Sequence, residues 1–327
     1  MIIVRAPLRI SIGGGGTDLP SYYREYGGFV VSGAIDKYVY ISINRTFFPG
    51  YLLKYSEVEQ ASSLEAIRHP LIRESLSVNE MHRNIEIVSI ADVPAGTGLG
   101  SSGTFLVALL HALHAYKNEQ VSAEALAREA VDIEMNRLQQ PVGKQDQYVA
   151  AYGGLICQEY RPDDGVEIRP LRISELAILE LRESLMLFFV GTTRSAPEIL
   201  RDHKTKLDQH DRAMIDGLHH IKKLGQEIKA GLEAGDVERF GQLMHEHWMQ
   251  KRSRSIGMSS GRIDELYELA RSRGGAVGGK LVGAGGSGFL LFQTRDRHRL
   301  RATMTEAGLS EMDFRFDFDG SVVMARN

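Results

Sequence analysis

The sequence predicts an α+β fold that is divided into two domains. Strand-like and helix-like segments follow one another irregularly, whereas a doubly wound parallel sheet needs regular strand–helix alternation. The chain has 327 residues, which is more than a single hydrophobic core usually serves. Its clearest change in composition is a polar stretch at 161–172, which contains two prolines and a glycine. We therefore expect an N-terminal domain over residues 1–175 and a C-terminal domain over residues 176–327.

Segments rich in β-branched and other apolar residues predict the strands of the N-terminal half. The first two are separated by Pro7 and end at a cluster of glycines, and the last follows Gly153-Gly154. These segments are Ile2–Val4, Leu8–Ile12, Tyr38–Ile43, Asn84–Ile90 and Leu155–Tyr160.

Three other segments of this half predict helices. Ser56–Val78 is polar and weakly periodic, whereas Thr104–Ala115 is almost entirely apolar and therefore predicts a buried, central helix. Ser122 is a suitable N-cap for the third helix, which is expected to run to about Leu138 and to stop before Pro141.

In the C-terminal half the pattern changes to long helices with few strands. The apolar run Leu185–Val190 predicts a buried strand, and residues 196–255 have a helical pattern interrupted by glycines. The remaining segments predict a helix at Asp264–Ser272, a strand at Phe289–Phe292, a helix at Arg297–Ala307, and a closing hairpin of Phe314–Phe318 with Val322–Met324.

The composition argues against several classes of function. The 39 basic and 42 acidic residues give a net charge of −3, so no electropositive surface for nucleic acid is expected. Arg5 and Arg9 come too early for the apolar core of a signal peptide, and no apolar run approaches the roughly 18–20 residues of a membrane span. The single Cys157 fits a reducing compartment. We expect a cytoplasmic protein that acts on a small molecule, and the sequence leaves open whether it forms a homo-oligomer.

Glycine is concentrated in three places along the chain. Of the 34 glycines, many fall in clusters at 13–16, 96–103 and 274–288. Glycine that is confined to a few loops of a globular chain indicates backbone that must approach another group closely. These three clusters are therefore the first candidates for a binding site.

The second cluster contains G-x-G-x-x-G at 98–103, the pattern of dinucleotide-binding loops, but the same pattern recurs at 283–288. A dinucleotide site also needs an acidic residue after a second strand about 20 residues further on. Here that position falls in a polar turn at 117–122. A P-loop needs G-x-x-x-x-G-K followed by Ser or Thr, and the chain contains no match to that pattern. The sequence therefore favours neither of these nucleotide-binding motifs.

The remaining interpretation is a glycine loop at the N-terminus of the predicted helix at Thr104–Ala115. Free amides and the helix dipole attract an anion at such a position. The adjacent hydroxyls of Ser101 and Ser102 would add ligands for phosphate oxygens or for a hard metal ion. The alternative is a tight turn that only caps the helix. Four glycines with two adjacent serines are more than a turn needs, which favours a phosphate site.

Glu134 lies on the apolar stripe of the helix that begins after Ser122, together with Ala127, Val131 and Leu138. A carboxylate that faces inward costs several kcal/mol unless it is paired or bound to a cation. One interpretation is a surface ion pair with Arg137, three residues on. The other is a Mg²⁺ ligand that acts with a serine of the glycine loop, since Mg²⁺ commonly takes one or two protein oxygens and nucleotide phosphates.

Asp146 lies between two glutamines just after a proline–glycine break, two residues beyond Lys144. An aspartate at the start of a short helix often only caps it. In a phosphoryl-transfer site, however, an aspartate accepts the proton of the attacking hydroxyl, and a nearby cation steadies the transferring group. Both interpretations of Asp146 remain open at this point.

Four separated motifs together resemble those of the GHMP kinases, a family of sugar and metabolite kinases. They are RAPLRISIGGGGTD at 5–18, PAGTGLGSSG at 94–103, EMNRLQQPVGKQDQY at 134–148 and GGKLVGAGGSGF at 278–289. The resemblance covers nearly the whole chain in the family's order. It implies ATP-dependent phosphoryl transfer to a small molecule. It also implies an N-terminal domain like domain 2 of ribosomal protein S5, followed by a ferredoxin-like C-terminal domain.

The resemblance also implies roles for individual residues. Asp146 would be the catalytic base, Arg9 and Lys144 would stabilise charge on the transferring group, and Mg²⁺ would be held by Ser102 and Glu134. The nucleotide would be bound by Pro94, Gly96, Gly98, Leu99, Gly100, Ser101, Ser102, Gly103 and Thr104. The substrate would be bound by Gly14, Gly15, Gly16, Thr17, Asp18, Asp146, Gly283 and Gly285.

One departure narrows the expected substrate. Galactokinase-like members have Glu-His where this chain has Gly15-Gly16, so galactose is not the expected acceptor. The glycine-rich version is similar to the heptose and fucose kinase branch of the family, which implies transfer to the anomeric O1 of a sugar or sugar phosphate. A phosphorylated acceptor would need a basic pocket, for which the candidates by residue type are Lys37, Lys251, Arg252 and Arg254. The alternative for the last three is a solvated helix end.

Overall fold

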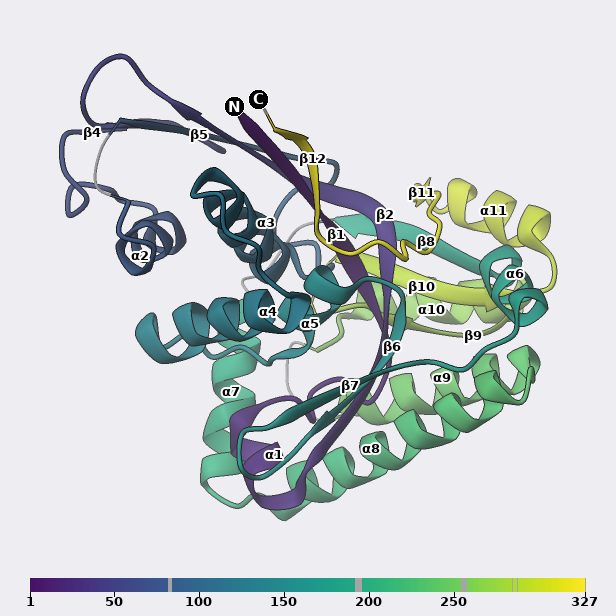
Figure 1. Cartoon of the computed structure of the whole chain (residues 1–327). Helices are drawn as coiled ribbons and strands as arrows, with labels where there is room; N and C mark the ends of the chain where they lie inside the picture. Colours follow the sequence, from purple (N-terminus) through teal and green to yellow (C-terminus); the bar gives the residue numbers. More distant parts are fainter. Residues whose placement is uncertain (82–83, 192–195, 254–257, 284, 287, 327) are drawn as a thin grey trace.

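Two β-sheets and the helices packed on them form the protein (Figure 1). The computed structural model describes residues 1–81, 84–191, 196–253, 258–283, 285–286 and 288–326. Among these residues, eight strands form the larger sheet and four form the smaller one. The mixture of mainly antiparallel strands with helices confirms the predicted α+β class.

The larger sheet is organised around the long strand β2 (Gly28–Arg45). Strand β1 (Ile2–Gly13) runs antiparallel along one edge of β2. On the other edge, the N-terminal part of β2 pairs with β6 (Leu155–Tyr160) and its C-terminal part pairs with β5 (Ile85–Ala91). The sheet is completed by β3 (Tyr51–Lys54), β4 (Val58–Ala61), β7 (Val166–Pro170) and β12 (Val322–Arg326).

Helices of the N-terminal half pack on this sheet, and α3 (Ser101–Tyr116) is the most buried of them, as its apolar sequence predicts. It contacts both β1 and β2, and its side chains join the main hydrophobic core. The neighbouring elements are α1 (Pro20–Tyr26), α2 (Pro70–Val78), α4 (Ala123–Val131), a π-helical turn (Asp132–Arg137) and α5 (Gln145–Tyr152). Ser122 caps α4 by accepting a hydrogen bond from the Ala125 amide, which confirms the predicted helix start.

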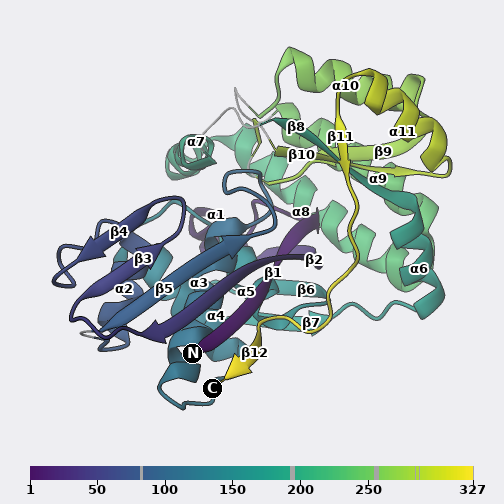
Figure 2. The same ribbon diagram turned by 90° about the horizontal axis from the view of Figure 1, so that it is seen from above.

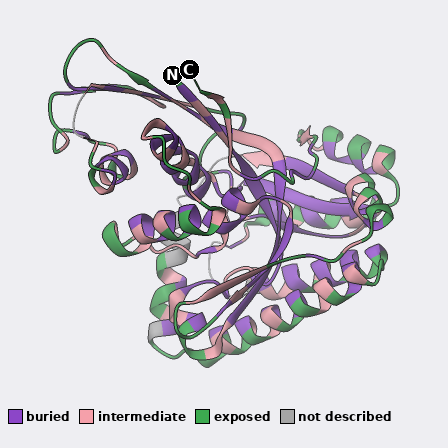
Figure 3. Cartoon of the chain, in the orientation of Figure 1, coloured by how far each residue is buried: buried purple, intermediate pink, exposed green. Residues whose placement is uncertain are grey.

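The smaller sheet has the strand order β11 (Ser310–Met312), β8 (Leu185–Gly191), β10 (Gly288–Thr294) and β9 (Ala276–Leu281). Large aromatic side chains fill its core, among them Trp248, Tyr267 and Phe292. The helices of this half are α6 (Glu175–Ser184), α7 (Ala196–Asp208), α8 (Arg212–Glu233), α9 (Val237–Ser253), α10 (Gly261–Ser272) and α11 (Arg297–Glu306). Figure 3 shows buried strands in both sheets and exposed outer faces on α8 and α9.

Helices α8 and α9 lie side by side and connect the two halves. α8 contacts β1 and β2 of the larger sheet, and α9 contacts β9 of the smaller sheet (Figure 2). None of the described helices combines the length and the apolar composition needed to cross a lipid bilayer.

Three predictions about individual elements are wrong. Pro7 does not end the first strand, because β1 continues through it with a register shift between Pro7 and Leu8, and proline is tolerated at such an irregularity. Ser56–Val78 is not one helix but contains β4, followed by α2, whose first residue is Pro70. Strand β9 lies in a segment that the sequence analysis treated only as a glycine cluster, because its two adjacent glycines hide the strand pattern.

The predicted closing hairpin is also wrong. Phe316 forms an isolated bridge with Ile35, and β12 pairs with β1 instead of turning back on Phe314–Phe318. The chain end therefore returns from the smaller sheet to the larger one. The domain boundary near residue 175 stays a prediction.

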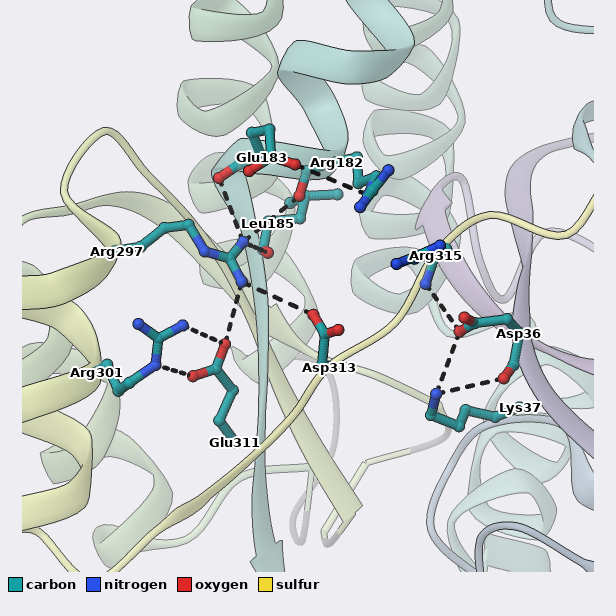
Figure 4. A network of polar contacts seen from close by, with 10 residues as sticks. All are labelled: Asp36, Lys37, Arg182, Glu183, Leu185, Arg297, Arg301, Glu311, Asp313 and Arg315. Atoms are coloured by element: carbon teal, nitrogen blue, oxygen red, sulfur yellow. Dashed lines mark hydrogen bonds and ion pairs between the residues drawn. The ribbon is translucent and has the colours of Figure 1, made fainter.

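Residues 310–316, the returning segment, lead from the smaller sheet back to the larger one. Polar contacts hold this segment at both of its ends (Figure 4). Arg297 of α11 donates to the Leu185 carbonyl at 2.7 Å and pairs with Glu311 at 3.1 Å. Further along, the Arg315 amide donates to Asp36 Oδ1 at 2.8 Å, and the Asp36 amide donates back to the Arg315 carbonyl. Residues 310–316 are thus held against β8 and β2 in turn.

A half-buried histidine joins three helices of the N-terminal half. His114, near the end of α3, contacts Glu129 of α4 and Glu119, both at 2.7 Å, and Asn79 at the end of α2 donates to the same Glu129 carboxylate at 2.9 Å. The hydrogen bond to Glu129 is the main reason that the pKa of His114 is raised above its ordinary value, with Glu119 adding to it.

The raised pKa of His114 predicts a pH-dependent stability. Protonated His114 stabilises the folded state fully at pH values below its unfolded pKa, about 6.5, and this stabilisation is lost as the pH rises through the higher folded pKa. We expect His114→Gln to lower the thermal midpoint at pH 6 and to lower it less at pH 9. His210→Gln, at a histidine whose side chain is exposed, is the control. Equal losses at both pH values would contradict the charged contact.

Candidate active site

A cavity of about 870 Å³ lies where the three glycine clusters meet. Its wall comes from β1 and the turn after it, from the glycine loop before α3, from α5, and from α7, α9 and the β9–β10 connection. Carboxylates and basic side chains both reach this wall. It is therefore the candidate active site.

The glycine loop at 96–100 is shaped by three alternating glycines in the left-handed region. Gly96, Gly98 and Gly100 have φ values of 80°, 82° and 80°, which other residues adopt only with strain. Gly100 is the N-cap of α3, so the first amides of that helix have no partner within the helix. They belong to the part of the chain that lines the cavity. Among the described residues, Ser101 Oγ is buried without a hydrogen-bond partner, and its side chain lines the cavity. The loop therefore presents donors that an anion could accept from, and the phosphate site stays a prediction.

The residues assigned to the nucleotide divide into two groups. The cavity is lined by Gly96, Gly98, Gly100, Ser101 and Ser102. The others hold the loop in place: Pro94 accepts a hydrogen bond from Thr97, Leu99 is fully buried, and Thr104 donates to the Pro7 carbonyl at 3.2 Å. Gly103 leaves room for α5, because a Cβ there would lie 2.9 Å from Asp146 Cβ.

Asp146, in the first turn of α5, forms an ion pair with Arg9 of β1. Arg9 Nε donates to Asp146 Oδ1 at 2.7 Å, and Arg9 Nη1 donates to the Gly98 carbonyl at 2.5 Å. The Arg9 side chain is buried, whereas about a quarter of the Asp146 side chain is exposed to the cavity. The pair therefore links the candidate base directly to the glycine loop.

Glu134 lies in the π-helical turn that follows α4 and is 2% exposed. Ser102 Oγ donates to its Oε1, and Gln147 Nε2 donates to its Oε2 at 2.7 Å. Burial raises the pKa of Glu134, and the charge of Asp146 raises it further. Arg137 pairs with Asp132 at 3.0 Å, so the surface ion pair considered for Glu134 does not form. Single π-helical turns are frequent at functional sites.

The donor set around Glu134 fits a magnesium ion. The Ser102 hydroxyl and the Glu134 carboxylate are adjacent oxygen ligands at the cavity wall, and a cation would favour the charged form of the buried carboxylate. The described residues contain no group of three or more histidine, cysteine, aspartate or glutamate side chains placed to hold a metal. Most ligands of an ion here would therefore come from phosphate oxygens and water, as Mg²⁺ permits.

The third carboxylate is that of Asp18, which is 2% exposed. Its Oδ2 accepts a hydrogen bond from Gln145 Nε2 at 3.4 Å. Asp18 also accepts hydrogen bonds from the Gly16 amide at 2.9 Å and from the Gln145 amide at 3.3 Å. Burial raises the pKa of Asp18, and the nearby charge of Asp146 adds to the effect. Asp18 and Asp146 are thus held close together on the wall of one cavity.

The other residues assigned to the substrate also divide into lining and supporting positions. Gly15, Gly16 and Gly283 line the cavity. Thr17 is fully buried and donates to the carbonyls of Gly14 and Phe29, so Gly14 and Thr17 build the turn that carries Asp18. Gly285 packs against Met258, where a Cβ would lie 2.7 Å from the sulfur.

Lys144 does not reach Asp146. Its ammonium group donates to the Asp164 carbonyl at 3.0 Å and lies over the ring of Tyr23, 4.6 Å from the centroid. Burial lowers the pKa of Lys144. The structure brings only Arg9, of the two predicted cations, to the candidate base.

Of the four basic candidates for an acceptor phosphate, Lys251 lines the cavity. Lys37 pairs with Asp36 at 3.2 Å, and Figure 4 shows this pair beside Arg315. Arg252 pairs with Asp264 at 3.5 Å. Arg254 lies outside the described residues.

Several residues of the wall were missed by the sequence analysis. The rings of Tyr55 and Phe105 both contact the ring of His69, with centroids 4.7 Å and 5.3 Å apart, and all three residues line the cavity. Burial lowers the pKa of His69 and so disfavours its charged form. Gly143, His203, His247 and Lys280 also line the cavity. No local pattern marks them, because they become neighbours only in the fold.

Comparison with known proteins agrees with this geometry. The model for the GHMP kinases N terminal domain matches residues 64–154, and the model for the GHMP kinases C terminal matches residues 228–308. The chain belongs to the GHMP kinases. ATP is the phosphate donor of this family.

The relatives include sugar kinases. The D-glycero-alpha-D-manno-heptose 7-phosphate kinase of Campylobacter jejuni is 28% identical over 98% of this chain and 97% of its own length. The bifunctional fucokinase/GDP-fucose pyrophosphorylase of Arabidopsis thaliana is 27% identical over 91% of this chain and 30% of its own length. The crystal structure of a D-glycero-D-manno-heptose 1-phosphate kinase from Bacteroides thetaiotaomicron superimposes with a TM-score of 0.82 at 25% identity, covering both chains completely. The chain is therefore a phosphotransferase that acts on a sugar.

Gly143 provides a test of the site. A Cβ at this position would lie 1.8 Å from Asp18 Oδ2, so Gly143→Ala must displace that carboxylate. We expect KM for the sugar to rise by at least about tenfold, because small misplacements in an active site are costly, while KM for ATP changes little. Gly261→Ala is the control, since a Cβ there meets nothing within 4 Å. Steady-state kinetics with each substrate varied would check this, and an unchanged KM for the sugar would contradict the role of Asp18.

Proposed function

We propose that this protein is an ATP-dependent kinase of D-glycero-D-manno-heptose 7-phosphate. It transfers the γ-phosphoryl group to the anomeric O1 and produces the 1,7-bisphosphate, a precursor for GDP-heptose and surface polysaccharide such as capsule or lipopolysaccharide. The observation that carries the proposal is the Asp146–Arg9 pair on the wall of a cavity shared with the glycine loop. The similarity to heptose phosphate kinases over the full length of the chain supports the choice of acceptor.

The nucleotide phosphates would lie on the loop at 96–100 and on the first amides of α3. The adenine would lie against the rings of Tyr55, His69 and Phe105, which line the cavity. Ser102 and Glu134 would hold Mg²⁺, which when bound neutralises charge on the phosphates. The sugar would lie over Gly15 and Gly16, with its hydroxyls toward Asp18.

In the chemical step, the anomeric oxygen attacks the γ-phosphorus and forms the new O–P bond. The bond from the γ-phosphorus to the oxygen bridging to the β-phosphate breaks, and ADP leaves with that oxygen. Asp146 accepts the proton of the anomeric hydroxyl. Arg9, held by Asp146 and the Gly98 carbonyl, stabilises the charge that develops on the transferring group. An anomeric hydroxyl is more acidic than an ordinary alcohol, so the aim of Asp146 matters more than its basicity.

An assay of ADP release tests the function directly. The acceptors compared would be D-glycero-D-manno-heptose 7-phosphate, the free heptose, fucose and galactose, and phosphorus NMR would identify the position phosphorylated. We expect turnover of the heptose 7-phosphate with a new signal of an anomeric phosphate. Turnover of fucose without turnover of the heptose phosphate would instead identify a fucokinase, to which the Arabidopsis relative is a precedent.

Replacing the base tests the mechanism. Asp146→Asn keeps the size of the side chain but removes the proton acceptor, so kcat should fall by at least about 10²-fold while KM for ATP changes little. Asp163→Asn, at an exposed carboxylate outside the cavity, is the matched control and should retain wild-type turnover. Near-wild-type turnover of Asp146→Asn would remove Asp146 as the base.

Replacing Glu134 tests the metal site. Glu134→Gln should raise the Mg²⁺ concentration for half-maximal activity by more than about tenfold. It should also raise the thermal midpoint without metal at neutral pH, because the pKa of Glu134 is raised by burial and its ionised form therefore costs stability there. Glu124→Gln, at an exposed position of α4, is the control. A lower midpoint with an unchanged Mg²⁺ requirement would show a purely structural role.

A further inference from the structure

One buried polar side chain of the cavity wall takes no part in the catalytic step described above. Gln147 directly follows Asp146 in α5, lines the cavity and is 1% exposed. Its Nε2 donates to Glu134 Oε2 at 2.7 Å, a length typical of a strong hydrogen bond to a carboxylate. A buried amide is costly unless it is hydrogen-bonded, so this contact ties Gln147 to the proposed metal ligand.

The direction of this hydrogen bond follows from the chemistry of the two groups. A glutamine amide has a donor nitrogen and an acceptor oxygen, whereas an ionised carboxylate can only accept. The nitrogen must therefore face Glu134 whenever that carboxylate is charged. Within the described part of the chain, the other end of the amide, Gln147 Oε1, is buried without a hydrogen-bond partner. Of the partners that the described residues provide, Glu134 is thus the one that orients the Gln147 amide.

Glu134 has a hydrogen-bond donor on each of its carboxylate oxygens. Ser102 Oγ of α3 donates to Oε1, and Gln147 Nε2 of α5 donates to Oε2. Two donors from two helices resist rotation of the carboxylate about its last bond. The direction of its remaining lone pairs is therefore set before a cation arrives. Carboxylates that ligate metals generally depend on hydrogen-bonded partners of this kind.

Close packing of α5 on α3 puts Gln147 within reach of Glu134. A Cβ on Gly103 would lie 2.9 Å from Asp146 Cβ and 3.2 Å from the Gln147 amide nitrogen. The first turn of α5 can therefore lie this near to α3 because Gly103 has no side chain. The same contact between the two helices places both the candidate base and the donor to Glu134.

An uncharged amide suits this position better than a charged group. A lysine or an arginine here would neutralise Glu134 and so compete with a cation. A carboxylate would add to the charges of Asp18, Glu134 and Asp146, which already line the cavity. Glutamine donates a hydrogen bond and brings no net charge, so the charge of Glu134 is kept for the cation.

Gln145, on the other side of Asp146, contacts a different carboxylate. Its Nε2 donates to Asp18 Oδ2 at 3.4 Å, and its backbone amide donates to the same oxygen at 3.3 Å. Each residue of an α-helix turns it by about 100°, so residues two apart lie on nearly opposite sides of the helix. Gln145 is therefore a comparison of the same residue type whose side-chain nitrogen donates to Asp18 instead of Glu134.

We infer that Gln147 is a positioning residue for the catalytic cation: its amide sets the orientation of the Glu134 carboxylate, and it acts on the reaction through that carboxylate. The inference rests on the proposed function in one respect, the placement of Mg²⁺ at Ser102 and Glu134. It does not depend on which sugar accepts the phosphoryl group. The first turn of α5 then supplies the base with Asp146 and orients the metal ligand with the next residue.

Kinetics of three glutamine variants test this role. Gln147→Met keeps the length of the side chain and removes the donor. We expect it to raise the Mg²⁺ concentration for half-maximal activity by about tenfold or more and to change KM for the sugar by less than about threefold. Gln145→Met should show the reverse split, and Gln120→Met, at an exposed position, is the control. A rise in KM for the sugar with an unchanged Mg²⁺ requirement in Gln147→Met would overturn the assignment.

A double-mutant cycle separates action through Glu134 from a structural role. Two residues that act through one contact give effects that do not add. In the Glu134→Gln background, Gln147→Met should therefore raise the Mg²⁺ requirement by less than about twofold further. A full additional rise in the double variant would show that Gln147 acts independently of Glu134, which contradicts the inference.

Thermal unfolding provides a measurement that needs neither turnover nor a sugar. A ligand that binds the folded state raises the thermal midpoint. ADP with Mg²⁺ should raise the midpoint of the wild-type protein more than ADP with EDTA. We expect Gln147→Met to shrink this Mg²⁺-dependent increment and to keep the shift that ADP with EDTA produces. An undiminished Mg²⁺-dependent increment would count against the positioning role.

The inference and the proposed function fail in different ways. An unchanged Mg²⁺ requirement in Glu134→Gln would overturn the metal site and this inference with it. A raised requirement in Glu134→Gln but not in Gln147→Met would overturn this inference alone, and the choice of acceptor is decided separately by the assay of ADP release. If Gln147→Met does not fold, Gln147→Asn, whose amide is one methylene shorter, carries the same test, and an unchanged Mg²⁺ requirement there would overturn the inference.

Discussion

The ion pair between Arg9 and Asp146 is the contact on which the rest of the site depends. It joins β1 to α5, and through the Gly98 carbonyl it also fixes the glycine loop. A buried guanidinium is costly without a charged partner, so the glycine loop, Asp146 and the first strand must keep this arrangement together. The same pair leaves Asp146 partly exposed to the cavity, where a proton acceptor is useful. The ion pair that holds the loop in place is thus the same contact that positions Asp146 at the cavity wall.

Close backbone contact between the two halves is the second constraint. A Cβ on Gly283 would lie 2.5 Å from the Cα of Gly98, and a Cβ on Gly288 would lie 2.1 Å from the Thr97 carbonyl. Two glycine clusters that are far apart in sequence therefore pack against each other without side chains between them. This contact sets the glycine loop of one half against the β9–β10 connection of the other, and residues of both segments line the cavity. Neither Gly283 nor Gly288 can therefore be replaced by a residue with a side chain unless the backbone moves.

The sequence predicted the parts of the fold and site that depend on local pattern. The apolar helix α3, the capped helix after Ser122 and the inward position of Glu134 all follow from helical periodicity, and the structure confirms them. The parts that depend on long-range pairing were wrong or absent. β12 pairs with β1 from the opposite end of the chain, and Lys144 meets Asp164 rather than its neighbour in sequence, Asp146. Gly143 matters only because Asp18, 125 positions earlier, comes to lie against it.

The carboxylates of Asp18, Glu134 and Asp146 line one cavity, and their closeness lowers the stability of the folded chain. Burial and mutual repulsion raise the pKa values of Asp18 and Glu134, so in their ionised forms both groups destabilise the folded chain. A bound sugar would give Asp18 hydroxyl donors, and a cation would offset the charge of Glu134. Ligands that relieve such repulsion bind the folded state only, so their binding energy stabilises it. Binding of the sugar and of the cation would therefore be coupled to the stability of the folded chain, because each would compensate a carboxylate whose ionised form burial disfavours.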